Sequence, residues 1–272
     1  MVICAFLRTK NAGLNKVVTL SNSYAGADAG NYSITDQGTT TANISAKALS
    51  ISGSSAANKS YDGTTNAVIT AGTLSGLVGT ETLTVSGAGS FASKNVGSYS
   101  INTTYSLSDA GVGATAGLAS NYTLGNESLS ASISAKTLSI SGSSAASKTY
   151  DGSTNAVITV GTLSGLVGTE TLTVSGAGSF ASKNVGNYSI NTAYSLSDAG
   201  TGSTAGLASN YSLANESLSA SISAKALSIT GITAANKTYD GNTNATILNA
   251  GNLSGLVGSE TLTLNGLSGT FS

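Results

Sequence analysis

The chain has 272 residues, of which 11 are basic and 12 are acidic, and its formal net charge at neutral pH is −1. This balance gives no field that would steer nucleic acid or an anionic membrane, so we expect neither as a partner. Charged residues make up only 8% of the chain, which is too few for a self-repelling disordered coil. We therefore expect a folded protein.

A nine-residue segment recurs at a fixed spacing of 89 residues, at 59–67, 148–156 and 237–245. Around it, residues 47–135 and 136–224 align without a gap and differ at eleven of 89 positions, none of them a tyrosine or a charged residue. A fixed period of this length indicates one structural unit copied along the chain. We predict a tandem array of four parts: the C-terminal part of a truncated repeat (1–46), two full repeats (47–135 and 136–224) and the N-terminal part of another (225–272).

The first part corresponds to the later half of a full repeat. Its Lys10–Gly13 and Asn31–Ile34 segments match 94–97 and 121–124, and Phe6 matches Phe91. Residues 1–7 are apolar but lack the basic start and the cleavage site of a signal peptide, so we interpret them as the start of a fragment. Cys4 is the single cysteine, and no disulfide can form within the chain.

Within residues 47–135, apolar side chains alternate with small polar ones, a pattern typical of half-buried strands. The longest alternation places Tyr99, Ile101, Tyr105 and Leu107 on one face, and we expect this strand to form the core. Glycines bracket a turn at 74–79, which predicts a strand, turn, strand arrangement. In chain order, we predict strands at 49–52, 68–70, 81–86, 99–107, 122–124 and 129–133, with 53–58 as a connection and 109–120 as a loop.

The alternation changes phase where one repeat meets the next. Leu129, Ala131 and Ile133 have odd numbers, whereas Leu138 and Ile140 have even ones. Because a shift of one residue turns every side chain to the opposite face, we expect the chain to leave one core and enter another here. We place the repeat boundaries at these Ala-Lys pairs, with no flexible linker between repeats.

No segment shows the spacing of an amphipathic helix, and proline is absent. Six or seven strands joined by turns containing Gly, Asn and Asp favour a small sandwich-like, immunoglobulin-like β domain in each repeat. We therefore predict an all-β tandem array. The alternative is a β-solenoid, whose rungs would repeat every 20 to 30 residues or so; no such subperiod occurs within the 89 residues.

The sequence offers no catalytic, cofactor or metal site, and we expect a protein that is not an enzyme. Histidine is absent, and the twelve carboxylates are dispersed singly. Calcium would need several oxygen ligands, whereas Asp62–Gly63 supplies one carboxylate. Tyr61, Asp62 and Gly63 have a structural interpretation as a turn, with Gly at positive φ and a buried tyrosine ring. The sequence does not assign ligand-binding residues.

The order of motifs resembles a known repeat family. Lys-x-Tyr-Asp-Gly-x-Thr is followed by Leu-Ser-Gly-Leu-Val-Gly-x-Glu, Phe-x-x-Lys-Asn-Val-Gly, Asn-Tyr and Ile-x-Ala-Lys. This order is similar to the YDG-type repeat domain of large bacterial surface and secreted proteins, often filamentous-haemagglutinin-like adhesins exported by two-partner secretion. The resemblance implies an extracellular or cell-surface location and a role as a stalk or array; it implies no catalytic residues.

Three functions are weighed. The first is a non-enzymatic structural stalk of an adhesin, and the second is a carbohydrate- or receptor-binding module that acts by avidity on host or matrix glycans. Burial of Tyr61, Tyr99, Tyr105 and Tyr122 would favour the stalk, and an open aromatic face would favour binding. The third is a self-associating biofilm or matrix component, and we expect head-to-tail association of the truncated ends. No apolar run is long enough to insert into a membrane.

Overall fold

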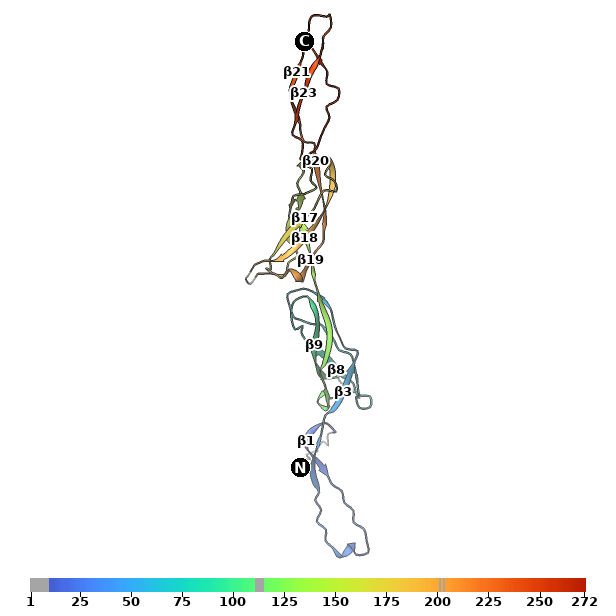
Figure 1. Ribbon diagram of the computed structural model, residues 1–272. Coiled ribbons are helices and arrows are strands. Elements are labelled where there is room, and N and C mark those ends of the chain that lie inside the picture. The colour runs from blue at the N-terminus through green and yellow to red at the C-terminus, as the bar shows by residue number, and fades with distance from the viewer. Residues whose placement is uncertain (1–9, 111–114, 201, 203) are drawn as a thin grey trace. The chain divides into compact units, whose positions relative to one another are not determined.

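The computed structural model describes residues 10–110, 115–200, 202 and 204–272 (Figure 1). Cys4 and Phe6 lie outside these residues. The chain divides into two compact units, residues 1–135 and 136–272. Each unit contains one full repeat and one partial repeat, and each is described by itself.

The first full repeat consists of short strands and one 3-10 turn. Its elements are β3 (Lys47–Ser52), β4 (Ser55–Ala56), β5 (Lys59–Ser60), β6 (Ile69–Thr70), β7 (Thr73–Ser75), β8 (Leu83–Ala88), β9 (Gly97–Asp109), η2 (Ala119–Asn121), β10 (Tyr122–Leu124) and β11 (Glu127–Ser134). The second full repeat has the same elements in the same order. These are β12 (Lys136–Ser141), β13 (Ser144–Ala145), β14 (Lys148–Thr149), β15 (Ile158–Thr159), β16 (Thr162–Ser164), β17 (Leu172–Ala177), β18 (Gly186–Asp198), η3 (Ala208–Asn210), β19 (Tyr211–Leu213) and β20 (Glu216–Ser223).

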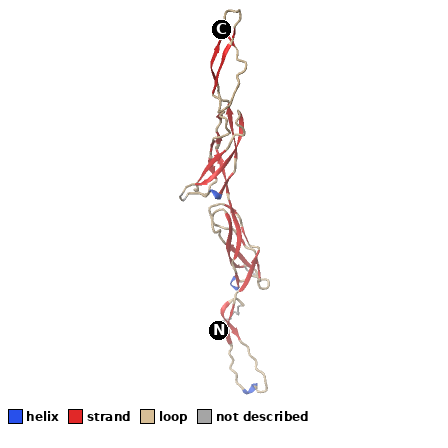
Figure 2. Cartoon of the chain, viewed as in Figure 1, coloured by secondary structure: helices blue, strands red, loops and turns tan. Residues whose placement is uncertain are grey.

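The strands of each full repeat form small sheets within that repeat. In the first, the sheet orders are β5-β11-β9-β8, β10-β3-β7 and β4-β6. The long strand β9 pairs antiparallel with β8 and β11, and these strands can be followed in Figure 1. Two pairs are parallel, β10 with β3 and β5 with β11. Figure 2 shows that strands and loops make up nearly all of the described chain.

The core of the second repeat lies between its four-stranded sheet and a two-stranded one. Phe180, Ile190, Ala220 and Ile222 form the buried cluster, and Ala145 and Ile158 pack against it from β13 and β15. The four-stranded sheet of β18 and β20 is thus covered on its inner face by the β13–β15 pair. The predicted fold class, an all-β array of small sandwich-like domains, is confirmed. Since the strands pair within single repeats throughout the described residues, they do not form the rungs of a solenoid.

One local prediction is wrong. Residues 53–58, predicted as a connection, contain β4, which pairs with β6; the segment carries small residues, so alternation could not reveal it. The strand, turn, strand arrangement predicted around 74–79 is present as β7, a turn and β8, and the structure adds that β7 pairs with β3 whereas β8 pairs with β9. The turn therefore carries the chain from one sheet to another.

The change of phase at the repeat boundary is confirmed by burial. In β11 the buried residues are Leu129, Ala131 and Ile133, and in β12 Leu138 is buried and Ile140 half-buried. The chain passes from one strand to the next with one residue, Ala135, between them. The side chains of Ile133 and Leu138 both point inward, and because of the change of phase they belong to different cores.

The partial repeats keep the strand register of the full ones. At the N-terminal side, β1 (Gly13–Thr19) pairs with β2 (Thr39–Ile44) so that Gly13 faces Ile44, as Gly97 faces Ile133. A 3-10 turn, η1 (Ala29–Asn31), lies between them. The C-terminal partial repeat consists of β21 (Ser228–Ala234), β22 (Asn244–Ala245), β23 (Ile247–Ser254) and β24 (Gly269–Thr270), with β21 paired to β23 and β22 paired to β24.

Candidate functional site: the signature turn and the repeat junction

The signature turn of the first full repeat closes around the ammonium group of Lys59. Lys59 Nζ donates to Asp62 Oδ1 at 2.8 Å, to the Thr64 carbonyl at 2.8 Å and to Thr64 Oγ1 at 2.9 Å. The buried Phe91 ring faces the same ammonium, with 5.3 Å from Nζ to the ring centroid. Three oxygens and one aromatic face therefore satisfy this cation within the repeat.

Asp62 fixes the backbone of the turn. Its Oδ1 accepts the Thr64 amide at 2.9 Å and the Thr64 hydroxyl at 2.9 Å, an aspartate turn in which the side chain replaces a backbone acceptor. Gly63 has a φ of 77°, where a residue with a Cβ would be strained. The Phe91 amide donates to the Thr65 carbonyl at 2.8 Å and ties the turn to the rest of the repeat. The turn predicted from this segment is present.

The same contacts recur in the other two copies of the signature. Lys148 Nζ lies 2.8 Å from Asp151 Oδ1 and 2.9 Å from Ser153 Oγ. In the third copy, Lys237 keeps its aspartate ion pair at 2.7 Å, and Asn242 Oδ1 supplies the side-chain acceptor at 2.9 Å. The position after the glycine thus carries Thr, Ser or Asn, all of them short side chains with an acceptor oxygen. This shared chemistry was present in the sequence and was not used in the prediction.

Acidification should weaken the fold through these aspartates. The Lys59 ammonium and the Thr64 amide lower the pKa of Asp62 to about 2, and the pKa of Asp151 falls to about 2 for the same reason. A carboxyl whose pKa is about 3.9 in the unfolded chain stabilises the folded state above that pH, and this contribution is lost as the pH falls towards 2. We expect unfolding free energy to decrease between about pH 4 and pH 2, and the carboxyl-carbon NMR signal of Asp62 to titrate near pH 2. Lys59→Met should move that titration towards pH 4; a wild-type midpoint near 4 would contradict the assignment.

Two tyrosine–carboxylate pairs join distant strands of each full repeat. Tyr122 donates to Glu81 Oε2 at 2.5 Å, and its hydroxyl accepts the Val78 amide at 3.1 Å. Tyr105 donates to Glu127 Oε2 at 2.7 Å. In the second repeat the corresponding distances are 2.6 Å for Tyr211 with Glu170, 3.0 Å for Val167 with Tyr211 and 2.7 Å for Tyr194 with Glu216.

The electrostatics of these pairs favour a neutral tyrosine beside an ionised carboxylate. Burial raises the pKa of Tyr211 to about 12, and the Glu170 carboxylate contributes to the rise. The hydrogen bond from Tyr122, followed by the one from Lys10, lowers the pKa of Glu81. At neutral pH each tyrosine therefore keeps its proton and donates it to an acceptor that carries the charge.

A loop of one repeat docks onto the next repeat within each unit. In the first unit, Lys10 Nζ pairs with Glu81 Oε1 at 3.1 Å. The Ala12 amide donates to Asn121 Oδ1 at 2.8 Å, and Asn121 Nδ2 donates to Asn11 Oδ1 at 3.1 Å. The Lys10–Gly13 segment is thus held by a glutamate and an asparagine from the following repeat.

The second unit shows the same junction with the partial repeat 225–272. Lys183, which corresponds to Lys10, lies 3.9 Å from Glu260 Oε1. Tyr150 of the signature also donates a hydrogen bond to this Glu260 oxygen. One glutamate of the incoming repeat therefore receives both the loop lysine and the signature tyrosine of the repeat before it.

The carboxylates of the first full repeat are all engaged in such contacts. Their donors are Lys59 for Asp62, Tyr122 for Glu81, the Ala119 amide for Asp109 and Tyr105 for Glu127. Across the described residues, no three side chains of the His, Cys, Asp or Glu type gather in a way that could hold a metal ion. No helix in this part of the chain combines the length and the apolar character of a membrane span.

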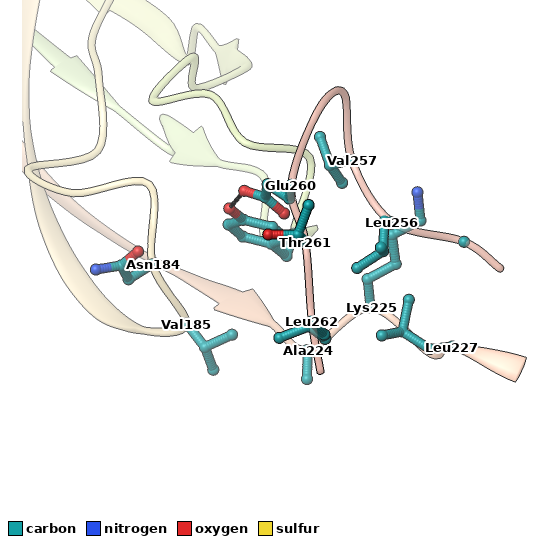
Figure 3. A pocket seen from close by; sticks show the side chains of 12 residues that line it. Asn184, Val185, Ala224, Lys225, Leu227, Leu256, Val257, Glu260, Thr261 and Leu262 are labelled. Carbon is teal, nitrogen blue, oxygen red and sulfur yellow. Dashed lines mark hydrogen bonds between the residues drawn. The ribbon is translucent and has the colours of Figure 1, made fainter. Parts of the chain in front are cut away.

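The second unit has a cavity of about 430 Å³ at its repeat junction. Its walls come from the Asn184–Val185 loop, the 224–227 segment and the 255–262 segment, together with Tyr150. Tyr150 donates a hydrogen bond to Glu260, and Figure 3 shows Glu260 among the side chains of these walls. Most of the residues in the walls are apolar. Glu260 and Lys225 contribute charged groups, and Asn184 contributes an amide. No sequence pattern predicted this cavity.

With this geometry established, the chain can be compared with known families. The family model for the YDG domain matches residues 45–131, 134–219 and 223–272. The chain belongs to the YDG domain family. Each of the three YDG matches contains one copy of the signature turn, so the turn described above is a repeated feature of the YDG domains of this chain. No curated protein and no solved structure matches the chain.

Sequence reasoning found the signature turn but missed the partners of the glutamates. A signal was available, since Glu81 and Tyr122 are separated by 41 residues and so are Glu170 and Tyr211. Spacing alone could not turn this into a contact, because many residue pairs keep their spacing in two nearly identical repeats. The contact is made only in the folded repeat, where Tyr122 of β10 donates to Glu81 across 41 residues of sequence.

Proposed function

We propose that this chain is a non-enzymatic structural segment of a bacterial secreted or cell-surface adhesin, a stalk or array of YDG domains that carries another binding part. The observation that supports this most is the internal use of the reactive side chains. The four carboxylates of residues 47–135 all bind donors of the fold itself. None of them is left as a free acid or base for chemistry on a substrate.

The aromatic side chains support the same proposal over glycan binding. Tyr61 and Tyr122 are 2% and 6% exposed, and Tyr99 and Tyr105 are half-buried. A carbohydrate-binding face needs aromatic rings open to solvent, on which sugars can stack. Within the full repeats the tyrosines are instead buried or half-buried, and several of their hydroxyls bond to carboxylates or carbonyls, as in Tyr99 to the Asn95 carbonyl at 2.7 Å.

If the chain acts as a spacer, we expect an extended particle without affinity for glycans. A compact globule of 272 residues would have a radius of gyration of about 19 Å. We expect small-angle scattering on the whole chain to give a value well above this, independent of salt, and a glycan panel to show no saturable binding. A radius close to 19 Å would refute the stalk, and saturable binding of a sugar would favour the binding module.

We also propose an extracellular or cell-surface location, reached by two-partner secretion. The support is the resemblance of these YDG repeats to those of filamentous-haemagglutinin-like adhesins. Antibodies raised against residues 47–224 should label intact cells of the producing bacterium or its culture medium. Labelling only after the cells are permeabilised would refute this location.

A further inference from the structure

Each full repeat carries a free edge on its four-stranded sheet. In the first repeat, β8 lies at one side of the order β5-β11-β9-β8 and pairs with β9 alone. In the second repeat, β17 holds the same place beside β18. Both pairs of strands are labelled in Figure 1. The two edges belong to the full repeats, so each is formed by a complete set of strands.

The outer side of β8 is unpaired between its two ends. Thr82, just before the strand, bridges to Ala116, and Ser90, just after it, bridges to Asn66. Between these points, no backbone hydrogen bond joins residues 83–88 to any described residue outside β9. The bridges that flank β17 are Thr171 with Ala205 and Ser179 with Asn155. Because alternate residues of an antiparallel pair direct their N–H and C=O groups away from the partner, about half of each strand presents unpaired backbone groups.

The features that usually block a sheet edge are absent from β8 and β17. Proteins hinder pairing at an edge with charged side chains, proline or a bulge. Both strands read Leu-Thr-Val-Ser-Gly-Ala, and the chain contains no proline. The pairing of β8 with β9 runs without a shift from Leu83 to Ala88. Each edge is therefore a straight, uncharged template for another strand.

The exposed face beside each edge is also uncharged. On β8 and β9 it carries Thr84 opposite Ser108, Ser86 opposite Ser106 and Ala88 opposite Thr104. On β17 and β18 it carries Thr173 opposite Ser197, Ser175 opposite Ser195 and Ala177 opposite Ala193. The whole chain has a net charge of only −1. An identical chain can therefore approach this edge without like-charge repulsion, and hydroxyl pairs across strands stabilise a sheet.

We propose that β8 and β17 bind the same edge strands of a second copy of this chain, as antiparallel neighbours that extend the four-stranded sheet. Residues opposite each other in such a pair share one face of the sheet. The exposed face stays continuous when Ser86 lies opposite Ser86 of the second copy, which places Thr84 opposite Ala88. On the inner face, Val85 then lies opposite Gly87, so two bulky side chains do not meet.

The identity of the two edges favours a second copy as the partner. Because β8 and β17 have the same six residues, each edge fits its own kind and the other equally well. A pair of identical edges is isologous and closes on itself. The chain carries two such edges, however, and can therefore contact more than one copy. One pair of six-residue strands is a small contact, and a second pair strengthens the association through avidity.

We expect sedimentation velocity of the whole chain to show dimers and larger species that grow with concentration. The double variant Ser86→Lys with Ser175→Lys places like charges directly opposite each other in every pairing of the edges. It should weaken association about tenfold or more. Both serines are exposed, so the variant should keep the melting temperature of the unmodified chain.

The matched control is the double variant Ser130→Lys with Ser219→Lys. These serines are exposed on the same face of β11 and β20, two strands away from the edge. The control adds the same charge to the chain and should leave association unchanged. Equal loss of association in both double variants would mean that net charge alone is responsible, which would overturn the proposal.

A charge-exchange experiment separates this contact from other forms of aggregation. Ser86→Glu with Ser175→Glu should be monomeric by itself, and an equimolar mixture with the lysine variant should associate, because opposite charges then face each other. Backbone hydrogen exchange at 83–88 and 172–177 should slow with concentration in the unmodified chain and not in the lysine variant.

Two further results would contradict the proposed edge contact. One is an unmodified chain that stays monomeric up to about 1 mM, which would leave these edges to a strand of a different protein. The other is an association that the lysine variant does not weaken, which would mean that copies meet through another surface. The contact goes beyond the proposed stalk role, and either can fail without the other, because the stalk is tested by the dimensions of the single chain.

Discussion

Replacing Ile101 with alanine should separate the unfolding of the two full repeats into two thermal transitions. Ile101 lies in the middle of β9 and is fully buried, as are Phe91 and Ile133 around the same core. Shortening the Ile101 side chain to that of alanine lowers the free energy of unfolding by about 2–5 kcal/mol. This loss lowers the melting temperature of a domain of this size by about 10 °C or more. The second repeat keeps Ile190 at the same position and should unfold as in the unmodified chain.

Scanning calorimetry of the whole chain can resolve these two transitions. Ile190→Ala should give the mirror result, with the second repeat melting early, and the double variant should bring the transitions together again. Ser106→Ala, at an exposed position of the same strand, serves as the neutral control. If Ile101→Ala shifts a single transition as a whole, the repeats unfold as one cooperative body, and the picture of domains with separate cores is wrong.

Gly72→Ala should have a comparable effect for a different reason. Gly72 lies between β6 and β7 and passes close to the turn after β3, where its amide donates to Ser54 Oγ at 3.2 Å. A Cβ at this position would lie 2.0 Å from the Ser52 carbonyl oxygen and 2.6 Å from the Ser54 nitrogen. Both are backbone atoms that cannot rotate away. We expect a loss of about 3 kcal/mol or more, at the upper end of overpacking costs.

The chain itself supplies a matched control for this substitution. Gly125 has no atom within 4 Å of its ideal Cβ, and the second repeat already carries Ala214 at the corresponding position. Gly125→Ala should therefore leave the melting temperature nearly unchanged. Gly161→Ala should reproduce the Gly72 result in the second repeat, where the Ser141 carbonyl oxygen lies 2.0 Å from the built Cβ. Similar stability of the Gly72 and Gly125 variants would refute the close approach of the two turns.

Much of the fold could be predicted from the sequence because the relevant signals are local. Alternation along β9 requires only that one face be buried, and Ile101 and Thr103 at 0% exposure confirm it. The phase change at Ala135–Lys136 depends likewise on neighbouring residues. The parallel pairings of β10 with β3 and of β5 with β11 could not be predicted, because they join segments about 75 residues apart. No local pattern distinguishes them from antiparallel neighbours.

The two candidate sites divide in the same way. The signature turn was predictable because its contacts span three to five residues, from Lys59 to Asp62 and Thr64. The cavity was not predictable, since its walls come from 150, 184–185, 224–227 and 255–262.

The three signature tyrosines show where the limit of the sequence lies. The sequence by itself determines the turn, because the lysine, aspartate and glycine that form it lie within a few residues of one another. In the partial repeat, Lys237 keeps its ion pair at 2.7 Å, and Gly241 has the same φ of 77° as Gly63. Tertiary structure alone decides the burial of the tyrosine, which is 2% exposed at Tyr61 and 94% exposed at Tyr239. Tyr61 is bonded through its amide to the Ser134 carbonyl at 2.9 Å, at the end of β11, and residues 225–272 contain no counterpart of that strand. Hydrogen bonds within a turn form wherever the segment occurs, whereas burial requires strands that arrive from elsewhere in the chain.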